Sequence, residues 1–573
     1  MLVGVLRQFP STTPRARARS IAGALLGLGL VASASAACTS DSTETTAGSD
    51  SGDTSDASES DETSGATSGS SETTSDGAMT TGSDASDSDT GDAAPVYEYA
   101  RGIRLTSMSA NQGVAVDIVR DGVALPEDEY SSRLVAGRYT LLRAHWNLHA
   151  DFEPRELIGR LTLTRADGTR YVDDFTVMVG GPSTDASLTK TFSWLLPPEE
   201  VVAGMQYRVE AFEADAATAA GEVSEPPPVL PLPGPGALAL HTSPMRMQVT
   251  LVPVLHQLDG CEQAPVITDA DVKAMREELE QANPVQEAIL TVREPMPYTD
   301  PIGGQANGFS PMLNALSMLR EADAPPDNVY YYGLMESCDG YPSGLLGQAL
   351  GIPSAPLPEL AHQRVATGRY WGNGADAAET FVHEVGHSQG RYHIACTGGE
   401  AGTDSSYPHS NGRIGVWGFG IHDHQLRSPT RNRDYMTYCQ NEWVSDFGWE
   451  KVFDVIETLT SWEMSARAED DARASAVLIG ALEPDGTSTW WTARGSVPAA
   501  DLTPGVTLTL TGPDGARELA AHHGLRPDSS TYNVFAPLPD DVARYTALEL
   551  RAAGELLVSR SLEDVRVLHE RSR

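Results

Sequence analysis

The segment that begins at His383 and ends at His393 constrains the fold more than any other part of the sequence. The stretch before it, 375–382, consists mostly of good helix formers, so a helix is expected here. On a helix, His383 and His387 are four residues apart and project from one face. Gly390 can adopt a positive φ, which would end the helix sharply and turn His393 back toward the other two histidines. The sequence therefore predicts a helix, a tight turn and a cluster of three imidazoles.

The spacing of these histidines suits a metal ion. Three imidazoles fill three positions of a tetrahedral zinc site and leave the fourth open, which is typical of catalytic rather than structural zinc. Glu384 is one residue round the helix, so its carboxylate is expected to reach a water molecule at the metal. We therefore predict one catalytic Zn²⁺ bound by His383, His387 and His393, with Glu384 as general base. The alternative is an ordinary core helix whose histidines are hydrogen-bonded, which would make the whole pattern a coincidence.

The eleven-residue pattern resembles that of the metzincin clan of zinc endopeptidases. Clan members also carry a Met-containing turn beneath the metal, and residues 433–439 contain a similar segment. The resemblance implies that Met436 forms an apolar base under the zinc ligands. It also implies that Tyr438 lies near the metal, where it ligates zinc at rest and stabilises the oxyanion during the reaction. Substrate would lie along an edge strand, for which residues 364–371 are the candidate.

Other residues could supply the third ligand. In the gluzincin arrangement, a Glu from a later helix replaces the third histidine. Glu400 is too close to the helix for that role, and Glu442 is a weaker candidate than His393, which has the right spacing. Three further histidines fall in a segment rich in Gly, Asn and Asp and are expected to be loop or substrate-cleft residues: His409, His422 and His424.

The cysteines indicate an oxidising environment. Apart from Cys38 there are four, and an even number in an exported chain predicts two disulfides with three possible pairings. If the resemblance holds, the metal brings the segments around His393 and Met436 together, which favours a Cys396–Cys439 bond. Cys261 and Cys338, which follow two adjacent predicted strands, then form the second pair. Metal binding by the thiols is the alternative, but their spacings contain no CxxC.

The N-terminal residues predict export. Residues 1–38 carry four Arg, an apolar run at 21–32 and a Ser-Ala-Ala-Cys end that resembles a lipobox, so we expect a lipoprotein-type signal peptide with Cys38 acylated. Ser35 departs from the usual Leu, and plain cleavage is the alternative. Residues 39–95 hold 14 acidic residues and no Lys or Arg, with too few apolar groups to fold, which predicts a disordered acidic tether. The protein would be a bacterial cell-surface or outer-membrane lipoprotein, or secreted, and would touch a membrane only through the lipid on Cys38.

The rest of the chain is long enough for about three domains. Residues 96–240 and 466–573 show alternating strands and turn signals, typical of β-sandwiches, and the first is expected to end in a stiff Pro-rich linker at 226–235. Residues 241–465 mix strand and helix signals. We therefore predict an α+β multidomain chain in which a metzincin-like mixed α/β catalytic domain is flanked by two all-β sandwich-like domains. The clearest elements expected in the middle domain are helices at 268–281 and from Ser310, and strands at 247–254 and 329–335.

Charge and motif together narrow the function. The net charge is −39, which argues against nucleic-acid binding. The predicted function is a monomeric zinc-dependent endopeptidase acting on extracellular proteins or peptides, with Ca²⁺ possible in the acidic loop at 400–406. Two alternatives stay open: an adhesion or binding lipoprotein with a degenerate zinc site, and a glycoprotein- or mucin-directed protease. The intact Glu384 speaks against the first, because an inactive relative commonly loses its general base.

Overall fold

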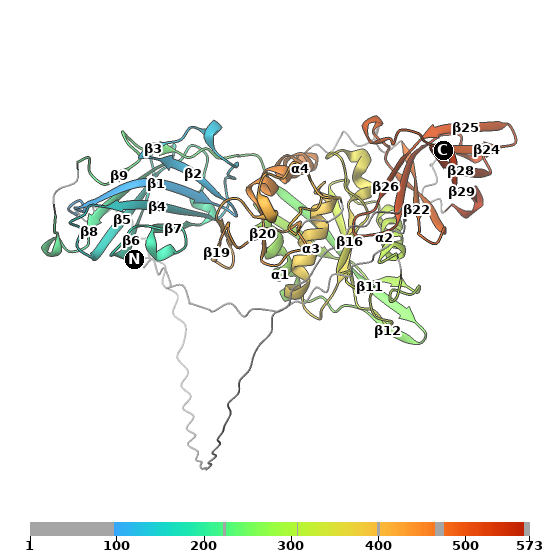
Figure 1. Cartoon of the computed structure of the whole chain (residues 1–573), viewed down its shortest axis with the longest axis horizontal. Helices are drawn as coiled ribbons and strands as arrows, with labels where there is room; N and C mark the ends of the chain where they lie inside the picture. The colour runs from blue at the N-terminus through green and yellow to red at the C-terminus, as the bar shows by residue number, and fades with distance from the viewer. Residues whose placement is uncertain (1–96, 222–224, 306, 398–401, 465–474, 566–573) are drawn as a thin grey trace, which may run out of the picture. The chain divides into compact units, whose positions relative to one another are not determined.

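The computed structural model describes residues 97–221, 225–305, 307–397, 402–464 and 475–565. The chain divides into two units, Met1–Val96 and Tyr97–Arg573, and all described residues belong to the second. In Figure 1 they run from blue near Tyr97 to red near the C-terminus. The predicted signal peptide, the acylation site at Cys38 and the acidic tether therefore lie outside the described residues.

Residues 97–240 form two antiparallel sheets around a shared core of buried aromatic and aliphatic side chains. A turn at 166–168 joins two long paired strands. The predicted linker at 226–235 is not a free linker, because two short strands within and just after it pair with the second sheet and bury Leu230 completely. The first sheet has the order β3 (Val123–Ala124), β2 (Ala115–Arg120), β1 (Ile103–Asn111), β4 (Thr140–Leu148) and β7 (Phe192–Leu196). The second has the order β10 (Gly236–Ala237), β8 (Gln206–Glu213), β5 (Arg155–Thr164) and β6 (Arg170–Val179), with β9 (Val229–Leu230) also paired to β8.

A seven-stranded mixed sheet lies at the centre of residues 241–464. Its order is β12 (Cys261–Gln263), β11 (Arg246–Leu258), β15 (Val329–Met335), β17 (Val365–Arg369) and β16 (Gly347–Ala349), with β13 (Glu287–Val292) and β14 (Met296–Tyr298) also paired to β11. β11, β15 and β17 run parallel, whereas the short edge strand β16 is antiparallel. All seven residues of β15 are buried, which explains why its sequence is an unbroken apolar run.

Helices cover the two faces of this sheet, as the alternation of side chains along β15 shows. Tyr330 and Tyr332 point into a core with α1 (Asp269–Ala282), α3 (Gly374–Ser388) and α4 (Asp446–Met464), whereas Tyr331 points into a core with α2 (Ser310–Asp323). Figure 1 shows α1 and α3 beside the central strands. The predicted helix start at Thr268 is confirmed: Thr268 and Asp271 form a reciprocal capping box.

Residues 475–565 form two further antiparallel four-stranded sheets. The first packs on the α2 face of the central sheet, where the indole of Trp491 is fully buried and donates to Ser317 Oγ at 3.3 Å. Its order is β23 (Ser488–Arg494), β22 (Ala476–Leu482), β27 (Tyr532–Leu538) and β26 (His522–Leu525). The second has the order β25 (Gly515–Ala520), β24 (Val506–Gly512), β28 (Ala547–Ala552) and β29 (Glu555–Ser561).

The predicted fold class was wrong. Over the described residues there are 29 strands and only four α-helices, so the fold is β-rich rather than the predicted α+β chain with a metzincin-like mixed α/β catalytic domain. The local helix signals were read correctly, but the helices are only 14 to 19 residues long and strands make up most of the regular structure. A motif that specifies one helix and one turn carries no information about the architecture of the several hundred other residues.

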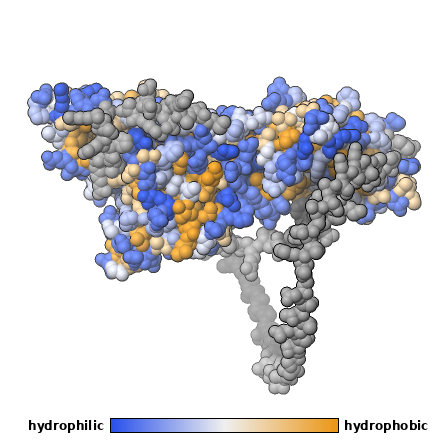
Figure 2. Space-filling model, turned by 180° about the vertical axis from the view of Figure 1, so that it is seen from behind, coloured by the Kyte–Doolittle hydropathy of each residue, from blue (hydrophilic) through white to orange (hydrophobic). Residues whose placement is uncertain are grey.

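Figure 2 shows hydrophilic residues over much of one face, with hydrophobic residues in separate patches. No helix among the described residues is both long enough and apolar enough to cross a membrane.

Candidate metal centre

Helix α3 positions the first two histidines. Its N-terminus is capped by Asn373, whose side chain accepts a hydrogen bond from the backbone N–H of Asp376. The helix ends at Ser388, and Gly390 follows with a φ of 90°, the conformation that the sequence predicted. A Cβ at Gly390 would also lie 2.8 Å from the carbonyl oxygen of Pro353, so only glycine fits at this turn. The turn directs the chain back toward α3.

Backbone carbonyls orient two of the imidazoles. Nδ1 of His383 lies 2.7 Å from the carbonyl oxygen of Tyr435, and Nδ1 of His387 lies 2.8 Å from that of Arg391. Because a carbonyl only accepts, each Nδ1 carries the proton and each Nε2 is left with a free lone pair. This is the usual arrangement of metal-binding histidines. His393 completes the cluster, with its Nε2 3.0 Å from Nε2 of His387.

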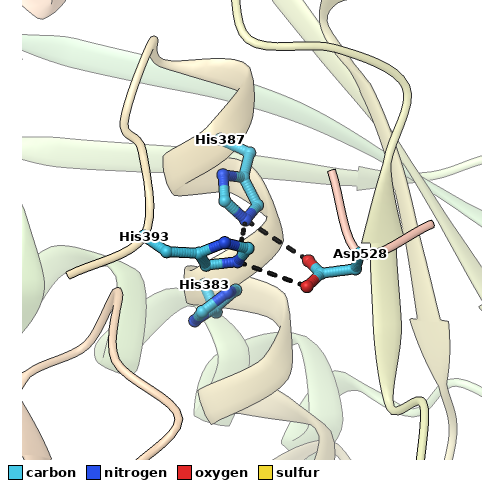
Figure 3. Close-up of side chains that lie close together, drawn as sticks. All are labelled: His383, His387, His393 and Asp528. Carbon is cyan, nitrogen blue, oxygen red and sulfur yellow. Dashed lines mark hydrogen bonds and ion pairs between the residues drawn. The ribbon is translucent and has the colours of Figure 1, made fainter. Parts of the chain in front are cut away.

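A fourth side chain, Asp528, enters the cluster from the loop between β26 and β27. Its carboxylate oxygens lie 3.4 Å from Nε2 of His387 and 3.2 Å from Nε2 of His393, and its side chain is only 8% exposed. In Figure 3, His393 reaches the cluster from the left and the Asp528 carboxylate faces it from the right. Sequence reasoning missed Asp528, because no spacing or motif connects it to the distant histidines. The one local signal is an Arg-Pro-Asp-Ser turn sequence, which indicates only a loop.

The residues present fit a metal ion. The ligand atoms of His383, His387, His393 and Asp528 all lie within 4.8 Å of one another. Ligand atoms of tetrahedral zinc, at about 2.0–2.1 Å from the ion, are roughly 3.3 Å apart, close to the spacings given above. Oε2 of Glu384 and Oδ2 of Asp528 are buried and have no hydrogen-bond partner among the described residues. Buried polar atoms are rarely left unsatisfied, so this group could hold a metal ion.

The protonation states of these side chains also suit a cation. Burial, helped by the neighbouring His387, lowers the pKa of His383 to about 3, and burial likewise lowers the pKa of His387. Burial opposes ionisation of Asp528, but its position beside His387 and His393 holds the pKa of this carboxyl well below its usual value. His383 and His387 therefore present unprotonated Nε2 atoms and Asp528 presents a carboxylate, which are the forms that bind metal ions.

Glu384 lies beside the four candidate metal ligands but is not one of them. Its carboxyl is buried, and burial, with a further contribution from Asp528, raises the pKa of this group well above its usual value. A Cβ at Gly347 would lie 2.6 Å from Cγ of Glu384, so the edge strand β16 passes directly against this side chain. The predicted edge strand at 364–371 is wrong: β17 is paired on both sides, and β16 forms the edge.

The segment around Met436 packs against α3 beside the histidines. Met436 is fully buried, and a Cβ on Gly386 of α3 would lie 2.6 Å from its sulfur. Its carbonyl oxygen accepts a hydrogen bond from the backbone N–H of Ile394 at 2.9 Å, next to the third histidine. The hydroxyl of Tyr438 is 2.9 Å from Nε2 of His393 and donates to the carboxylate of Asp528.

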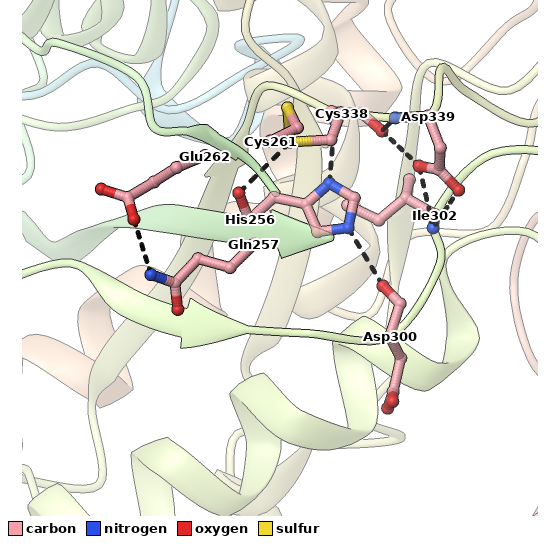
Figure 4. The surroundings of a disulfide bond; sticks show 9 residues. His256, Gln257, Cys261, Glu262, Asp300, Ile302, Cys338 and Asp339 are labelled. Atoms are coloured by element: carbon pink, nitrogen blue, oxygen red, sulfur yellow. Dashed lines mark hydrogen bonds between the residues drawn. A yellow bond between two sulfur atoms is a disulfide. The ribbon is translucent and has the colours of Figure 1, made fainter. Parts of the chain in front are cut away.

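The structure contains both favoured disulfides. Cys396–Cys439 links the segment after His393 to the segment after Tyr438, and so ties together two chain stretches that contribute to the site. Cys261–Cys338 links the β11–β12 hairpin to the loop after β15. In Figure 4 the imidazole of His256 lies beside this bond: its Nδ1 accepts from the backbone N–H of Cys338 at 2.9 Å. Two disulfides indicate an extracellular or otherwise oxidising environment.

The remaining candidates do not join the cluster. His409 pairs with Asp446, and His422 pairs with Glu280, each partly buried. Glu442 lies in β21 (Glu442–Trp443), outside the metal group, and His424 is also absent from that group. Glu400 lies outside the described residues, as does part of the loop proposed for Ca²⁺, so calcium binding there stays a prediction.

Comparisons with known proteins do not assign the chain to a family. No protein-family model and no curated protein matches the chain. Two crystal structures of β-glucosidase from Kluyveromyces marxianus, one in complex with glucose and one labelled with selenomethionine, align with it at 8% identity and a TM-score of 0.09. The alignments cover 81% and 80% of this chain and 51% and 49% of those chains, so the chain spans about half the length of these structures. Since a TM-score this low carries no structural argument, the function has to be argued from the site.

Proposed function

We propose that the chain is an exported zinc endopeptidase. The observation that carries the proposal is the buried group of three histidines with Glu384 next to it on the same helix. The three histidine nitrogens and the Asp528 carboxylate are ligands that zinc accepts. Glu384 lies beside them, where hydrolysis requires a general base. Zinc bound by these residues would supply a Lewis acid that acidifies water and polarises a scissile carbonyl.

Glu384 is the proposed proton carrier. Its raised pKa, caused by burial, suits a carboxylate that must both accept a proton from water and pass it to the leaving amine. The edge strand β16 runs against Glu384 and offers backbone groups that can hold an extended peptide beside it. The Tyr438 hydroxyl, 2.9 Å from Nε2 of His393, is close enough to the metal group to donate to the oxyanion as it forms.

The direct test is Glu384→Gln. We expect the variant to keep its metal, because Glu384 is not among the ligand atoms, and to lose protein hydrolysis by roughly 10²-fold or more. Zinc content by elemental analysis and cleavage of a panel of unfolded and glycosylated proteins give the two readouts. Glu379→Gln, at an exposed position on the same helix, is the matched control and should cleave like the wild type.

A second candidate function is favoured by Asp528. A metal held by four protein ligands is typical of a structural site, which would fit a surface-binding lipoprotein whose metal has no catalytic role. The cleavage assay therefore includes Asp528→Asn, in which the carboxylate no longer competes for the fourth position. If the metal-loaded wild type and metal-loaded Asp528→Asn both leave every protein of the panel intact, a structural metal site in a surface-binding lipoprotein replaces the endopeptidase proposal.

Export through a lipid anchor is part of the same proposal. The two disulfides support an oxidising compartment, and the lipobox-like end at Cys38 supports acylation there. Labelling of growing cells with a radioactive fatty acid should mark the wild type and leave Cys38→Ser unlabelled. Equal labelling of the two proteins would contradict acylation at Cys38.

A further inference from the structure

We propose that the β26–β27 loop closes the metal site, with Asp528 as the fourth ligand, and that the structure is a self-inhibited state. The inference rests on the proposed metal site but goes beyond the proposed reaction. Three features of the loop support it: the position of its carboxylate, its attachment to the sheet edge, and its contact with Tyr438.

The carboxylate lies where a fourth ligand belongs. Its oxygens lie 3.4 and 3.2 Å from the nitrogens of His387 and His393, and its side chain is 8% exposed. An ionised carboxylate is rarely buried unless it is paired or bound to a metal. With Asp528 in the fourth position, neither water nor a substrate carbonyl has a place on the ion.

Buried polar contacts hold the loop in this position. The guanidinium of Arg526, only 1% exposed, donates to the Ser310 carbonyl oxygen at 3.2 Å and to Oδ1 of Asn314 at 2.9 Å, both on α2. The hydroxyl of Thr531, also buried, donates to Oγ of Ser310 at 2.8 Å. Hydrogen bonds donated by a charged guanidinium are stronger than those between neutral groups, so these contacts fix one position of the loop.

The loop also occupies the edge of the central sheet. The Gln348 side chain, on edge strand β16, donates to the Pro527 carbonyl oxygen of the loop at 3.2 Å. Just beyond β16, the Leu350 carbonyl oxygen accepts at 2.6 Å from the side chain of Asn533, on β27 next to the loop. This is the edge that passes against Glu384 and that an extended peptide would use. A peptide and the loop therefore compete for the same place.

The contact with Tyr438 removes a further group from the reaction. The Tyr438 hydroxyl donates its proton to the carboxylate of Asp528, so it cannot donate to a substrate oxyanion. Asp528 itself has a φ of 50°, a left-handed conformation that only Gly, Asn and Asp adopt readily. Hydrolysis therefore requires the loop to withdraw from the ion, the sheet edge and Tyr438 together.

The test replaces Asp528 without straining the loop. Asp528→Asn preserves size and tolerance of positive φ, and Asp528→Gly removes the side chain at a φ that glycine accepts. Asp514→Asn, at an exposed turn of the same C-terminal sheets, is the matched control. Each full-length protein is loaded with Co²⁺ in place of zinc. The readouts are its visible absorption spectrum, its affinity for acetohydroxamate and its rate of protein cleavage.

Both Asp528 variants should change the cobalt spectrum, and the control should not. If fewer than about one molecule in ten is open in the wild type, acetohydroxamate should bind the variants at least roughly tenfold more tightly, and cleavage should rise by a similar factor. An unchanged spectrum and hydroxamate affinity would overturn the inference while leaving the endopeptidase proposal intact. Tighter hydroxamate binding without cleavage of any protein would uphold the closed site and overturn the endopeptidase proposal instead.

Discussion

Gly386 shows how closely α3 packs on the segment beneath it. A Cβ at this position would lie 2.6 Å from the sulfur of Met436 and 2.9 Å from Cε2 of Tyr435, both of which are buried. Gly386→Ala must therefore push apart the helix and the segment whose carbonyl orients His383. We expect a loss of about 1–3 kcal/mol in the free energy of unfolding, measured with denaturant. Gly181→Ala is the control, because no atom lies within 4 Å of its Cβ position; a similar loss there would contradict the packing argument.

Tyr438 should matter for the reaction rather than for metal binding. Its hydroxyl contacts His393 and Asp528, whereas the residue as a whole is 46% exposed and is not part of the buried core. In an Asp528→Asn background, where the hydroxyl is released, Tyr438→Phe should lower kcat/KM by roughly 10²-fold with zinc content unchanged. An undiminished kcat/KM would remove Tyr438 from the proposed mechanism.

At the residue scale, the sequence predicted the site residues that lie close together in the chain and missed Asp528, which lies far from them. His383, His387 and Glu384 are fixed by the period of a helix, and the φ of Gly390 by the need for a tight turn. Asp528 reaches the same point only through the packing of a distant loop on α2 and β16. Such a contact depends on tertiary structure, which no local pattern encodes.

The short helical element η5 (Pro358–Gln363) should make stability depend on pH. His362 on this element is 3% exposed, and burial, followed by the nearby cation Arg320, lowers its pKa to about 3. In the unfolded chain a histidine titrates near 6.5, so the unfolded state gains protons first as the pH falls. The contribution of His362 is thus fully present above about pH 6.5 and is lost progressively between about 6.5 and 3.

His362→Leu should therefore flatten the pH dependence of unfolding. Between pH 7.5 and 5.5, protonation of His362 is expected to lower the free energy of unfolding of the wild type by about 1.4 kcal/mol. The variant should not show this loss. Urea unfolding of both proteins at the two pH values measures the difference, and the comparison cancels the groups that titrate in both. Parallel pH curves would show that His362 is protonated equally in the folded and unfolded states.

Helices and strands with a clear sequence signal were predicted well, and those without one were not. The start of α1 and the limits of β15 follow from a capping box and an unbroken apolar run. Edge strand β16 has only three residues, too few to show any period, so the edge was assigned to β17 instead. The same limit explains the wrong fold class: short strands dominate the structure, and each carries a weak signal.

Across the whole molecule, the candidate ligands come from two distant parts of the chain. Three come from α3 and the turn after it, and the fourth comes from a loop of the C-terminal sheets. An ion that binds only the folded state stabilises it in proportion to the logarithm of its concentration over Kd, by about 4 kcal/mol at a thousandfold excess. Metal removal should therefore weaken the attachment of the β26–β27 loop as well as the fold around α3.

We expect a chelator to lower the melting temperature of the wild type and added zinc to restore it. The shift should be smaller in Asp528→Asn, because one ligand is weakened, while Asp514→Asn should behave like the wild type. Limited proteolysis can localise the effect: cleavage within the β26–β27 loop should increase in the chelated wild type. A melting temperature that is identical with and without chelator would mean that the four side chains hold no ion, since a ligand bound only to the native state must raise its stability.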